Sequence, residues 1–368
     1  MKNSATTLAS RTSQLVALAI RGLESMYDSE KRLFCHRVCK TPQGLKQEGI
    51  SHRYTIMTLL GVLEAQSAGW RHSTDLEATT DQLFSDTAWV TSVGDLGLLL
   101  WLCATLSEKR LQQFYSKFEL SQALERYPDA RRRLTMELSW FLTGLAQAYK
   151  AEQRSDLLSL ASEVFERLQA NQGQHGLFGH MAVWSSIRGL VRGRVGSFAD
   201  QVYPIVALSH FAEVANSAEA RESAFRCASA ICARQGSMGQ WWWHYDALSG
   251  RIVEHYPVYS VHQHGMAPMA LNAIQKVGQS DFQASIDNGL KWIDGANELR
   301  ESLEDAEAGI IWRCIRLPKP SSYAARLRTL VDKQAFSGSF HMLYECRPYE
   351  LGWLLYALAP STPALSTN

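Results

Sequence analysis

The sequence predicts an all-α protein whose helices form an (α/α)6 toroid, in which six inner helices are surrounded by six outer helices. Two observations lead to this prediction. Segments with an apolar stripe and a charged opposite face alternate six times with segments that are apolar on nearly every side. Helices that are apolar all round are expected to be buried, and the short connections predict that neighbouring helices run antiparallel.

The outer and inner helices can be assigned along the chain. The amphipathic outer candidates are 7–26, 74–85, 117–130, 154–170, 217–234 and 281–295. The inner candidates, which are richer in small residues, are 54–68, 95–107, 136–150, 201–215, 266–277 and 348–359. All six inner helices then begin at the same end of the ring, so the connections that lead into them crowd one mouth.

Several of these connections are predicted to contain small β-hairpins. Residues 242–246 and 251–256 flank the turn Ala-Leu-Ser-Gly, which is a typical hairpin pattern. Residues 27–34 are a looser copy of it.

The segment 296–345 is predicted to be a larger insertion within one domain. Its runs GIIWRCIRL and FHMLYECR are expected to pair as strands, with a helical piece near 323–333 between them. We predict a single catalytic domain over residues 1–360 and a disordered tail over 361–368.

The composition is that of a globular protein with a large core, 46% hydrophobic and 20% charged. The formal net charge of +1 favours neither nucleic acid nor an anionic membrane surface as a partner. The apolar run 15–20 is too short for a signal peptide or a membrane span. Seven cysteines without framework spacing fit a reducing compartment, so we expect a cytoplasmic protein.

No metal or cofactor is predicted. Cys35, His36 and Cys39 are close in sequence, but no second Cys/His pair has the matching spacing of a zinc site. We interpret them as ordinary half-buried side chains.

Gln235, Gly239 and Trp241 follow the pattern Q-x-x-x-G-x-W, and residues 172–178 follow it with Phe in place of Trp. This pattern resembles the QW motif of terpenoid cyclases and related α/α toroids, including protein prenyltransferase subunits. The resemblance implies a toroid in which Gln ties helix ends together and the ring packs behind it. The chemistry does not transfer, because the D-x-D-D motif of class II cyclases and the zinc ligands of prenyltransferases are absent. Many (α/α)6 toroids are instead carbohydrate-active enzymes.

The connections into the inner helices hold most of the residues suited to binding, as expected for loops on a rigid scaffold. The predicted mouth residues are Glu48, His52, Arg53, Tyr54, Asp95, Asp200, Gln201, Tyr203, Trp242, Trp243, Tyr256, Tyr259, His262, Gln263, His264, Tyr344, Glu345, Arg347, Tyr349 and Glu350. Rings mixed with hydrogen-bonding groups suit a sugar. Arg53 and Arg347 suit its carboxylate if the sugar is a uronate.

The sequence therefore predicts a carbohydrate-active enzyme that uses general acid–base chemistry on a small-molecule or oligosaccharide substrate, and it leaves two mechanisms open. Hydrolysis needs two carboxyls. The candidates for them are Glu48, Asp200, Glu254, Glu345 and Glu350.

Elimination or C5 epimerisation is the other mechanism. It needs a base, a proton donor and a cation beside the carboxylate. Tyr259, His262 and His264, with Arg53 or Arg347, suit these roles.

Structural interpretations of the same residues stay open. Glu345 and Glu350 bracket Arg347, an arrangement that also suits a buried ion-pair network at a helix start. Asp95 and Asp200 suit helix N-caps.

Two pairs of rings are each expected to divide between the cavity and the protein interior. His262 and His264 alternate along a stretch expected to be extended, so one of the two should face the cavity. Trp242 and Trp243 are expected to divide in the same way. Two other functions remain as alternatives: a terpenoid-cyclase-like enzyme acting on an isoprenoid, and a non-catalytic toroid that binds a glycan or a protein.

Overall fold

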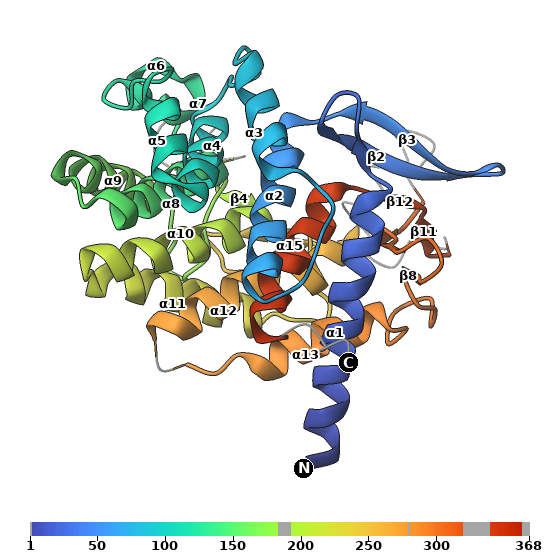
Figure 1. Cartoon of the computed structure of the whole chain (residues 1–368). Helices are drawn as coiled ribbons and strands as arrows, with labels where there is room; N and C mark the ends of the chain where they lie inside the picture. The colour runs from blue at the N-terminus through green and yellow to red at the C-terminus, as the bar shows by residue number, and fades with distance from the viewer. Residues whose placement is uncertain (1, 183–192, 279, 319–338, 363–368) are drawn as a thin grey trace.

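The computed structural model describes residues 2–182, 193–278, 280–318 and 339–362, and in this part of the chain inner and outer helices alternate (Figure 1). The inner helices are α2 (His52–Ser67), α4 (Val93–Leu106), α8 (Thr135–Glu152), α10 (Ala199–Ala215), α12 (Ala267–Val277) and α15 (Pro348–Leu358). Each inner helix contacts the next, and α15 contacts α2, so the inner ring closes.

Neighbouring inner helices touch through their backbones at glycines. A Cβ atom on Gly61 of α2 would lie 1.9 Å from the carbonyl oxygen of Gly352 in α15. A Cβ atom on Gly144 of α8 would lie 2.3 Å from the carbonyl oxygen of Gly97 in α4. Since no side chain fits at these distances, the small residues of the inner segments are explained by close helix packing.

The outer positions are held by α1, α3, α5, α9, α11 and α13. Their bounds are Lys2–Glu24, Leu76–Ser85, Glu108–Tyr115, Ser155–Gln169, Ala218–Cys232 and Gln283–Ile293. These bounds agree with the predicted ranges except at the third position.

The single helix predicted over 117–130 is wrong. The outer helix α5 already ends at Tyr115, and two short helices follow, α6 (Ala123–Arg126) and α7 (Pro128–Arg131). Tyr127 between them is extended, with φ −90° and ψ 128°. The residue before a proline disfavours the helical conformation, so Pro128 separates the two short helices.

All strand pairs in the described part of the chain are antiparallel and lie in the connections. β2 (Leu33–Thr41) pairs with β1 (Tyr27–Asp28), β3 (Gly44–Ile50) and β12 (Glu345–Cys346). A second sheet contains β4 (Val195–Ser197), β5 (His244–Asp246) and β6 (Ile252–Glu254). A third contains β7 (Val258–Tyr259), β10 (Cys314–Arg316) and β11 (His341–Leu343), and β8 (Glu304–Asp305) pairs with β9 (Ile310–Ile311).

These pairings confirm the predicted hairpins at 27–34 and 242–256 and the pairing of the two strand runs in the insertion. The long hairpin of β2 and β3 was not predicted. The helical piece expected near 323–333 lies outside the described residues.

The predicted tail begins two residues too early. Thr362 is buried, and its carbonyl oxygen accepts a hydrogen bond from Nε1 of Trp70 at 2.6 Å. Residues 363–368 lie outside the described residues, and the single-domain assignment stays a prediction.

The two Q-x-x-x-G segments are structural ties between successive outer helices. Nε2 of Gln235, which follows α11, donates to the carbonyl of Ser285 in α13 at 2.9 Å and to a carbonyl of its own turn at 3.0 Å. Gln172, which follows α9, donates in the same way to the carbonyl of Ser223 in α11 at 2.9 Å. The ring of Trp241 is fully buried. The structural role implied by the QW resemblance is confirmed.

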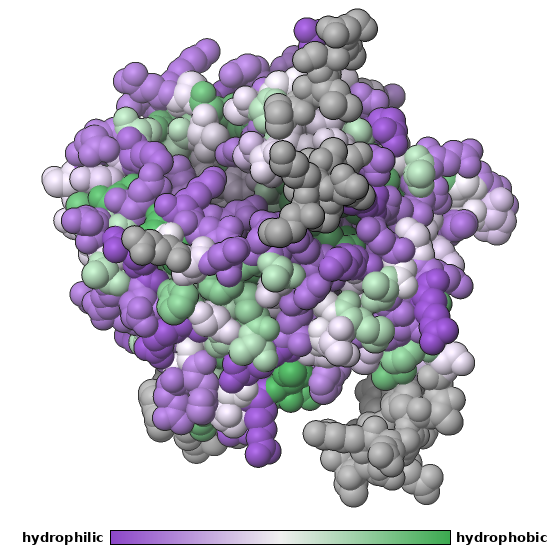
Figure 2. Space-filling model, turned by 90° about the horizontal axis from the view of Figure 1, so that it is seen from below, coloured by the Kyte–Doolittle hydropathy of each residue, from purple (hydrophilic) through white to green (hydrophobic). Residues whose placement is uncertain are grey.

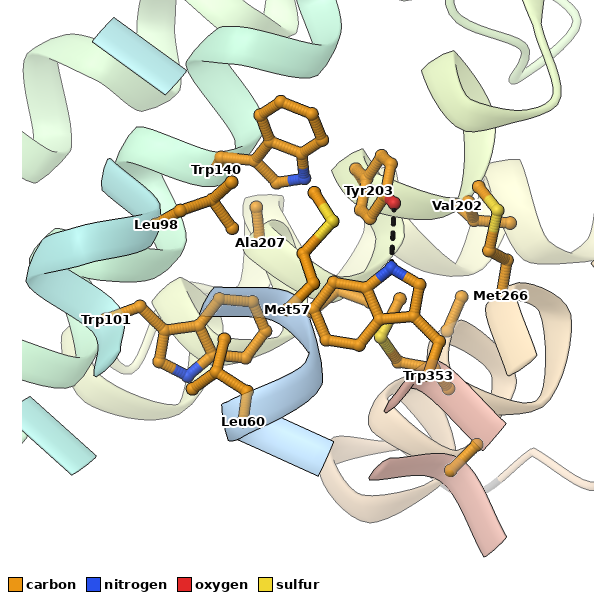
Figure 3. Close-up of a cluster of buried hydrophobic side chains, with 14 of the residues drawn as sticks. Met57, Leu60, Leu98, Trp101, Trp140, Val202, Tyr203, Ala207, Met266 and Trp353 are labelled. Atoms are coloured by element: carbon orange, nitrogen blue, oxygen red, sulfur yellow. Dashed lines mark hydrogen bonds between the residues drawn. The ribbon is translucent and has the colours of Figure 1, made fainter. Parts of the chain in front are cut away.

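The centre of the ring is filled by large apolar side chains (Figure 3). Trp101 and Trp353 lie 5.9 Å apart between ring centroids, and Nε1 of Trp353 donates to the hydroxyl of Tyr203 at 3.0 Å. The face viewed from the end where α1 begins is mostly hydrophilic, with smaller apolar areas between (Figure 2). Among the described helices, none is long and apolar enough to cross a membrane. The cytoplasmic location stays a prediction.

Candidate active site

The N-terminal parts of four inner helices, α2, α8, α10 and α15, surround a cavity of about 190 Å³, which we call the mouth cavity. A π-helix over His262–Met266 leads into α12 beside it, and such helices occur frequently at functional sites. The lining residues are Arg53, Tyr54, Met57, Met136, Trp140, Ala199, Tyr203, Trp243, Tyr259, Val261, His262, Met266, Arg313 and Tyr349. The connections into the inner helices therefore converge on one cavity.

Aromatic rings form much of the wall. The ring centroid of Trp243 lies 4.8 Å from that of Tyr259 and 6.0 Å from that of His262, whose plane is tilted by 12° from the indole. The rings of Tyr54 and Tyr349 lie 4.5 Å apart. These flat, partly polar side chains suit a ligand with apolar faces and hydroxyl edges.

Two guanidinium groups reach the same cavity. Nε of Arg53 donates to Asp95 at 2.8 Å, and the guanidinium lies 5.2 Å from the ring centroid of Trp140. The guanidinium of Arg313 lies 5.0 Å from the ring centroid of Tyr259, and its side chain is only 10% exposed. Both groups are suited to an anion.

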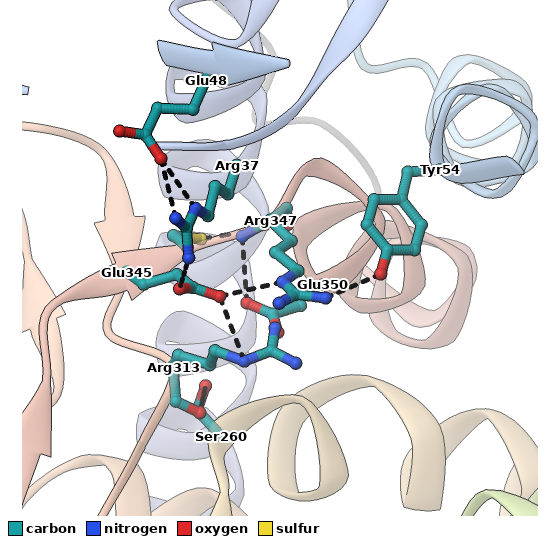
Figure 4. A network of polar contacts seen from close by, with 9 residues as sticks. Arg37, Glu48, Tyr54, Ser260, Arg313, Glu345, Arg347 and Glu350 are labelled. Atoms are coloured by element: carbon teal, nitrogen blue, oxygen red, sulfur yellow. Dashed lines mark hydrogen bonds and ion pairs between the residues drawn. The ribbon is translucent and has the colours of Figure 1, made fainter. Parts of the chain in front are cut away.

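Arg313 belongs to a cluster of ion pairs behind the cavity, which we call the Glu345 network (Figure 4). The Glu345 carboxylate accepts from Nη1 of Arg37 at 2.8 Å and from Nε of Arg347 at 2.9 Å, and it lies 3.4 Å from Nε of Arg313. Nη1 of Arg313 also donates to the buried carboxylate of Glu350. The predicted network interpretation is confirmed.

Two arginines of the Glu345 network also contact residues of β3 and α2. Nη2 of Arg37 pairs with Glu48 of β3 at 2.8 Å, and Nη1 of Arg347 donates to the Tyr54 hydroxyl at 2.7 Å. Burial raises the pKa of Glu345, but the hydrogen bond from Arg347 and the neighbouring guanidinium charges lower it by more, so its pKa lies below the ordinary value. The ionised form of Glu345 is therefore favoured, and the residue has a structural role in the Glu345 network, while its catalytic role stays a prediction.

Glu137 is a carboxyl beside the cavity that the sequence did not single out. It lies in the first turn of α8, between the lining residues Met136 and Trp140. Its Oε2 is buried and has no hydrogen-bond partner in the described part of the chain. Burial, aided by the charge of Asp200 and opposed by that of Arg53, raises the pKa of Glu137 to about 6. A carboxyl with this pKa can donate a proton near neutral pH.

Asp200 and Asp95 are both buried in the first turns of their helices, and neither is an N-cap. Ser92 caps α4, and Asp95 instead binds Arg53. Oδ2 of Asp200 accepts from the amide and the hydroxyl of Ser197, each at 2.9 Å, and lies 3.4 Å from a His180 ring nitrogen. The other oxygen, Oδ1, has no partner among the residues that the structure describes.

As expected, one of the two predicted histidines faces the cavity and the other does not. They lie in a π-helix, however, and not in the extended stretch that was predicted. His262 lines the cavity, whereas His264 is fully buried and neither ring nitrogen has a partner among the described residues. Burial lowers the pKa of both to about 3, so both rings are neutral near pH 7. His264 does not line the mouth cavity, so the described structure gives no support to its predicted catalytic role.

The cavity brings together part of the predicted set. The predicted residues that line it are Arg53, Tyr54, Tyr203, Trp243, Tyr259, His262 and Tyr349. Those that do not line it are Glu48, His52, Asp95, Asp200, Gln201, Trp242, Glu254, Tyr256, Gln263, His264, Tyr344, Glu345, Arg347 and Glu350.

The residues outside the lining have other partners. Glu254 lies on β6, pairs with His244 at 2.7 Å and is 54% exposed, so it is not a buried acid. Nε1 of Trp242 donates to a backbone carbonyl at 2.9 Å, which confirms the division between Trp242 and Trp243. The Tyr256 hydroxyl donates to Glu298 at 2.7 Å.

Two more of the predicted residues also have structural contacts. The ring of His52 stacks on Trp89 with centroids 5.2 Å apart. Gln263 is buried, and its Nε2 donates to the carbonyl oxygen of Tyr259 at 3.2 Å.

The residues that the sequence missed are Glu137, Trp140 and Arg313. The connection into α8, residues 131–135, contains no aromatic or histidine residue, but an acidic residue at the start of an otherwise apolar inner helix is a usable signal. The arginine within the apolar run GIIWRCIRL was a second one, because a charge in a buried strand needs a partner.

A larger cavity of about 440 Å³ lies at the other end of the ring and includes His210, Lys276 and Tyr356. Trp353 contacts Tyr356 there and Tyr203 at the mouth cavity, so aromatic core side chains lie between the two cavities. We take the mouth cavity as the candidate active site because two guanidinium groups and several aromatic rings line it, and a carboxyl of raised pKa, Glu137, lies in the helix turn beside it.

No protein-family model matches the chain, and no curated protein matches its sequence. Solved structures share the fold. An unsaturated glucuronyl hydrolase from Bacillus sp. GL1, described as responsible for glycosaminoglycan degradation, has a TM-score of 0.60 at 14% identity, covering 94% of each chain. A glycosyl hydrolase family 88 protein from Bacteroides vulgatus has a TM-score of 0.59 at 10% identity, covering 95% of this chain and 99% of the other.

A possible member of the GH105 family from Salmonella enterica has a TM-score of 0.60 at 11% identity, covering 96% of this chain and 94% of the other. At such low identity the likeness concerns the fold alone.

Proposed function

We propose that this chain is an (α/α)6 toroid enzyme of the glycoside hydrolase type that acts on a saccharide carrying a uronate. The mouth cavity carries the proposal, because aromatic rings and two guanidinium groups line it and Glu137, a carboxyl with a pKa raised to about 6, lies in the helix turn between two of its lining residues. The fold likeness to proteins named unsaturated glucuronyl hydrolases supports the same substrate class.

The cavity suits one terminal sugar unit. Its volume of about 190 Å³ is below the roughly 300–1,000 Å³ typical of pockets for drug-sized ligands. The rings of Trp243 and Tyr259 provide stacking surfaces at the wall. The uronate carboxylate would bind Arg313 or Arg53, whose charges are otherwise matched by Glu350 and Asp95.

Glu137 is the residue that we assign as the general acid. It would donate its proton to the glycosidic oxygen as the carbon–oxygen bond breaks. Asp200 is the candidate base for the attacking water, since its Oδ1 has no partner in the described residues while Oδ2 is held by Ser197.

Elimination is the second candidate reaction, and one observation favours it. The rings of Tyr259 and His262 lie 5.2 Å apart, and the Arg313 guanidinium lies over Tyr259. These groups match a proton acceptor, a proton donor and a cation beside a uronate. A pure isoprenoid hydrocarbon is disfavoured, because it offers no negative charge to the two guanidinium groups of the cavity, and an isoprenyl diphosphate is therefore the competing ligand in the test.

The test is a set of three disaccharides that differ in the terminal sugar: an unsaturated uronate, a glucuronate and glucose. We expect reducing sugar to be released from a uronate-terminated substrate at least about tenfold faster than from the neutral one. A rise in ultraviolet absorbance from a fourth disaccharide, in which the second sugar is linked to O4 of a glucuronate and leaves from there as the C5 proton is removed, would identify elimination instead. Glu254→Gln is the matched control, since this exposed carboxylate lies outside the cavity, and its activity should equal that of the wild type. Cleavage of none of the three, together with thermal stabilisation by an isoprenyl diphosphate, contradicts the proposal.

A further inference from the structure

Arg313 is held on two of its three nitrogen atoms by buried carboxylates. Nη1 donates to Glu350, which is fully buried, and Nε lies 3.4 Å from Glu345, which is 5% exposed. In the described part of the chain Nη2 has no hydrogen-bond partner, whereas Nη1 and Nε face Glu350 and Glu345, and Arg313 lines the mouth cavity. The group left for a ligand is therefore Nη2 of a guanidinium whose plane is already fixed.

The two carboxylates are themselves fixed. Glu350 lies in the first turn of α15, where its Oε2 accepts from the backbone amide of Arg347 at 3.1 Å. Glu345 lies on β12, which pairs with β2, and it receives Arg37 from that strand at 2.8 Å. A helix start and a sheet thus hold the Arg313 side chain from two directions (Figure 4).

We propose that Glu350 and Glu345 are positioning residues that direct Nη2 of Arg313 into the mouth cavity, and that this fixed group selects a ligand carrying a carboxylate over a neutral ligand of the same shape. The inference rests on the proposed function in that the ligand is taken to be a sugar. The inference goes beyond the proposed function in two ways. It assigns the choice between charged and neutral ligands to Arg313, and it assigns the orientation of Arg313 to two residues that do not line the cavity.

The alternative is that the Glu345 network only stabilises the fold. Its charges balance, since Arg37, Arg313 and Arg347 face Glu48, Glu345 and Glu350. A purely structural network would not affect the choice between charged and neutral sugars. Its removal would weaken the binding of both by the same factor.

The experiment measures the affinities of glucuronate and glucose for the full chain by titration calorimetry. We expect the wild type to bind glucuronate about tenfold more tightly, as a charge-assisted hydrogen bond allows. Arg313→Lys and Glu350→Gln should bring the ratio close to one while the affinity for glucose stays unchanged. Glu350→Asp, which keeps the charge, should restore part of the preference.

Two controls separate the outcomes. Arg316→Lys changes an arginine of the same strand that contacts His341 and not the network, and should keep the wild-type ratio. Glu345→Gln provides a second positioning variant if Glu350→Gln does not fold, and it should also lower the ratio.

The inference is overturned if the variants bind both sugars more weakly by the same factor, or if the wild type does not prefer glucuronate over glucose. A wild type that cleaves no saccharide can still prefer glucuronate over glucose. If Glu350→Gln then loses this binding preference, the result supports the inference and refutes the proposed reaction.

Discussion

At the scale of single residues, Glu137 has the environment that a general acid needs. Its Oε2 is buried without a hydrogen-bond partner among the described residues, and a buried carboxylate without a partner is costly. The neutral form is therefore favoured, and the pKa of Glu137 rises to about 6. By contrast, Glu345 is fixed in its charged form by three arginines, so two carboxyls near one cavity have opposite properties.

Replacing Glu137 by Gln should lower kcat by roughly 10²- to 10⁴-fold, the usual contribution of a general acid. In the wild type, activity should fall as pH rises through about 6, because the proton of Glu137 is lost there. The residual activity of the variant should not show this decrease as pH rises through about 6. A pH–rate profile on a uronate-terminated disaccharide checks both effects, and an unchanged profile in the variant would assign the acid elsewhere.

The same residue should make folding stability depend on pH. The pKa of Glu137 rises from 4.5 to about 6 on folding, so its contribution is fully present below pH 4.5 and is lost as pH rises through 6. Relative to the wild type, Glu137→Gln should gain on the order of 2 kcal/mol of unfolding free energy between these two pH values. Denaturant titrations at pH 4.5 and 7.5 measure this difference. A constant difference would mean that the carboxyl is not buried in solution.

At the scale of elements, the glutamine ties explain how successive outer helices keep their spacing. Gln235 joins the end of α11 to α13, and Gln172 joins the end of α9 to α11. Each tie satisfies carbonyl groups that would otherwise lack a partner at a helix junction. These side chains therefore contribute to the stability of the outer ring, while the cavity depends on the connections at the mouth.

Gln235→Ala should cost about 1–3 kcal/mol, because two carbonyl groups lose their donor. The folded variant should keep the catalytic rate of the wild type, since Gln235 does not line the mouth cavity. Chemical denaturation measures the loss, with Gln43→Ala in the exposed β2–β3 turn as a control expected within about 0.5 kcal/mol. A loss of rate without a loss of stability would contradict this division of roles.

At the scale of the whole molecule, the order of inner and outer helices could be predicted because helical periodicity is a local property of the sequence. The convergence of connections on one mouth followed from it. The β2–β3 hairpin could not be predicted, since most of β3 is exposed and shows no alternating pattern. Pro128 explains why the single outer helix predicted over 117–130 is wrong.

The candidate site was predicted only in part for a different reason. Seven of the predicted residues line the cavity, because position next to an inner helix is visible in the sequence. Whether a side chain points inward depends on contacts between distant segments. Arg313 and Glu350 are 37 residues apart, and the burial of Glu137 depends on Gly94 of a neighbouring helix, where a Cβ atom would lie 3.1 Å from Glu137.

The central claim is that the mouth cavity binds a uronate-bearing saccharide. A crystal structure of Glu137→Gln with an unsaturated uronate-terminated disaccharide tests it most directly, because the slow variant should hold the substrate intact. We predict the terminal uronate in the mouth cavity, with its carboxylate within hydrogen-bond distance of Nη2 of Arg313 and its ring against Trp243. Binding of the sugar at the opposite cavity beside His210, with the mouth cavity empty, would contradict the account.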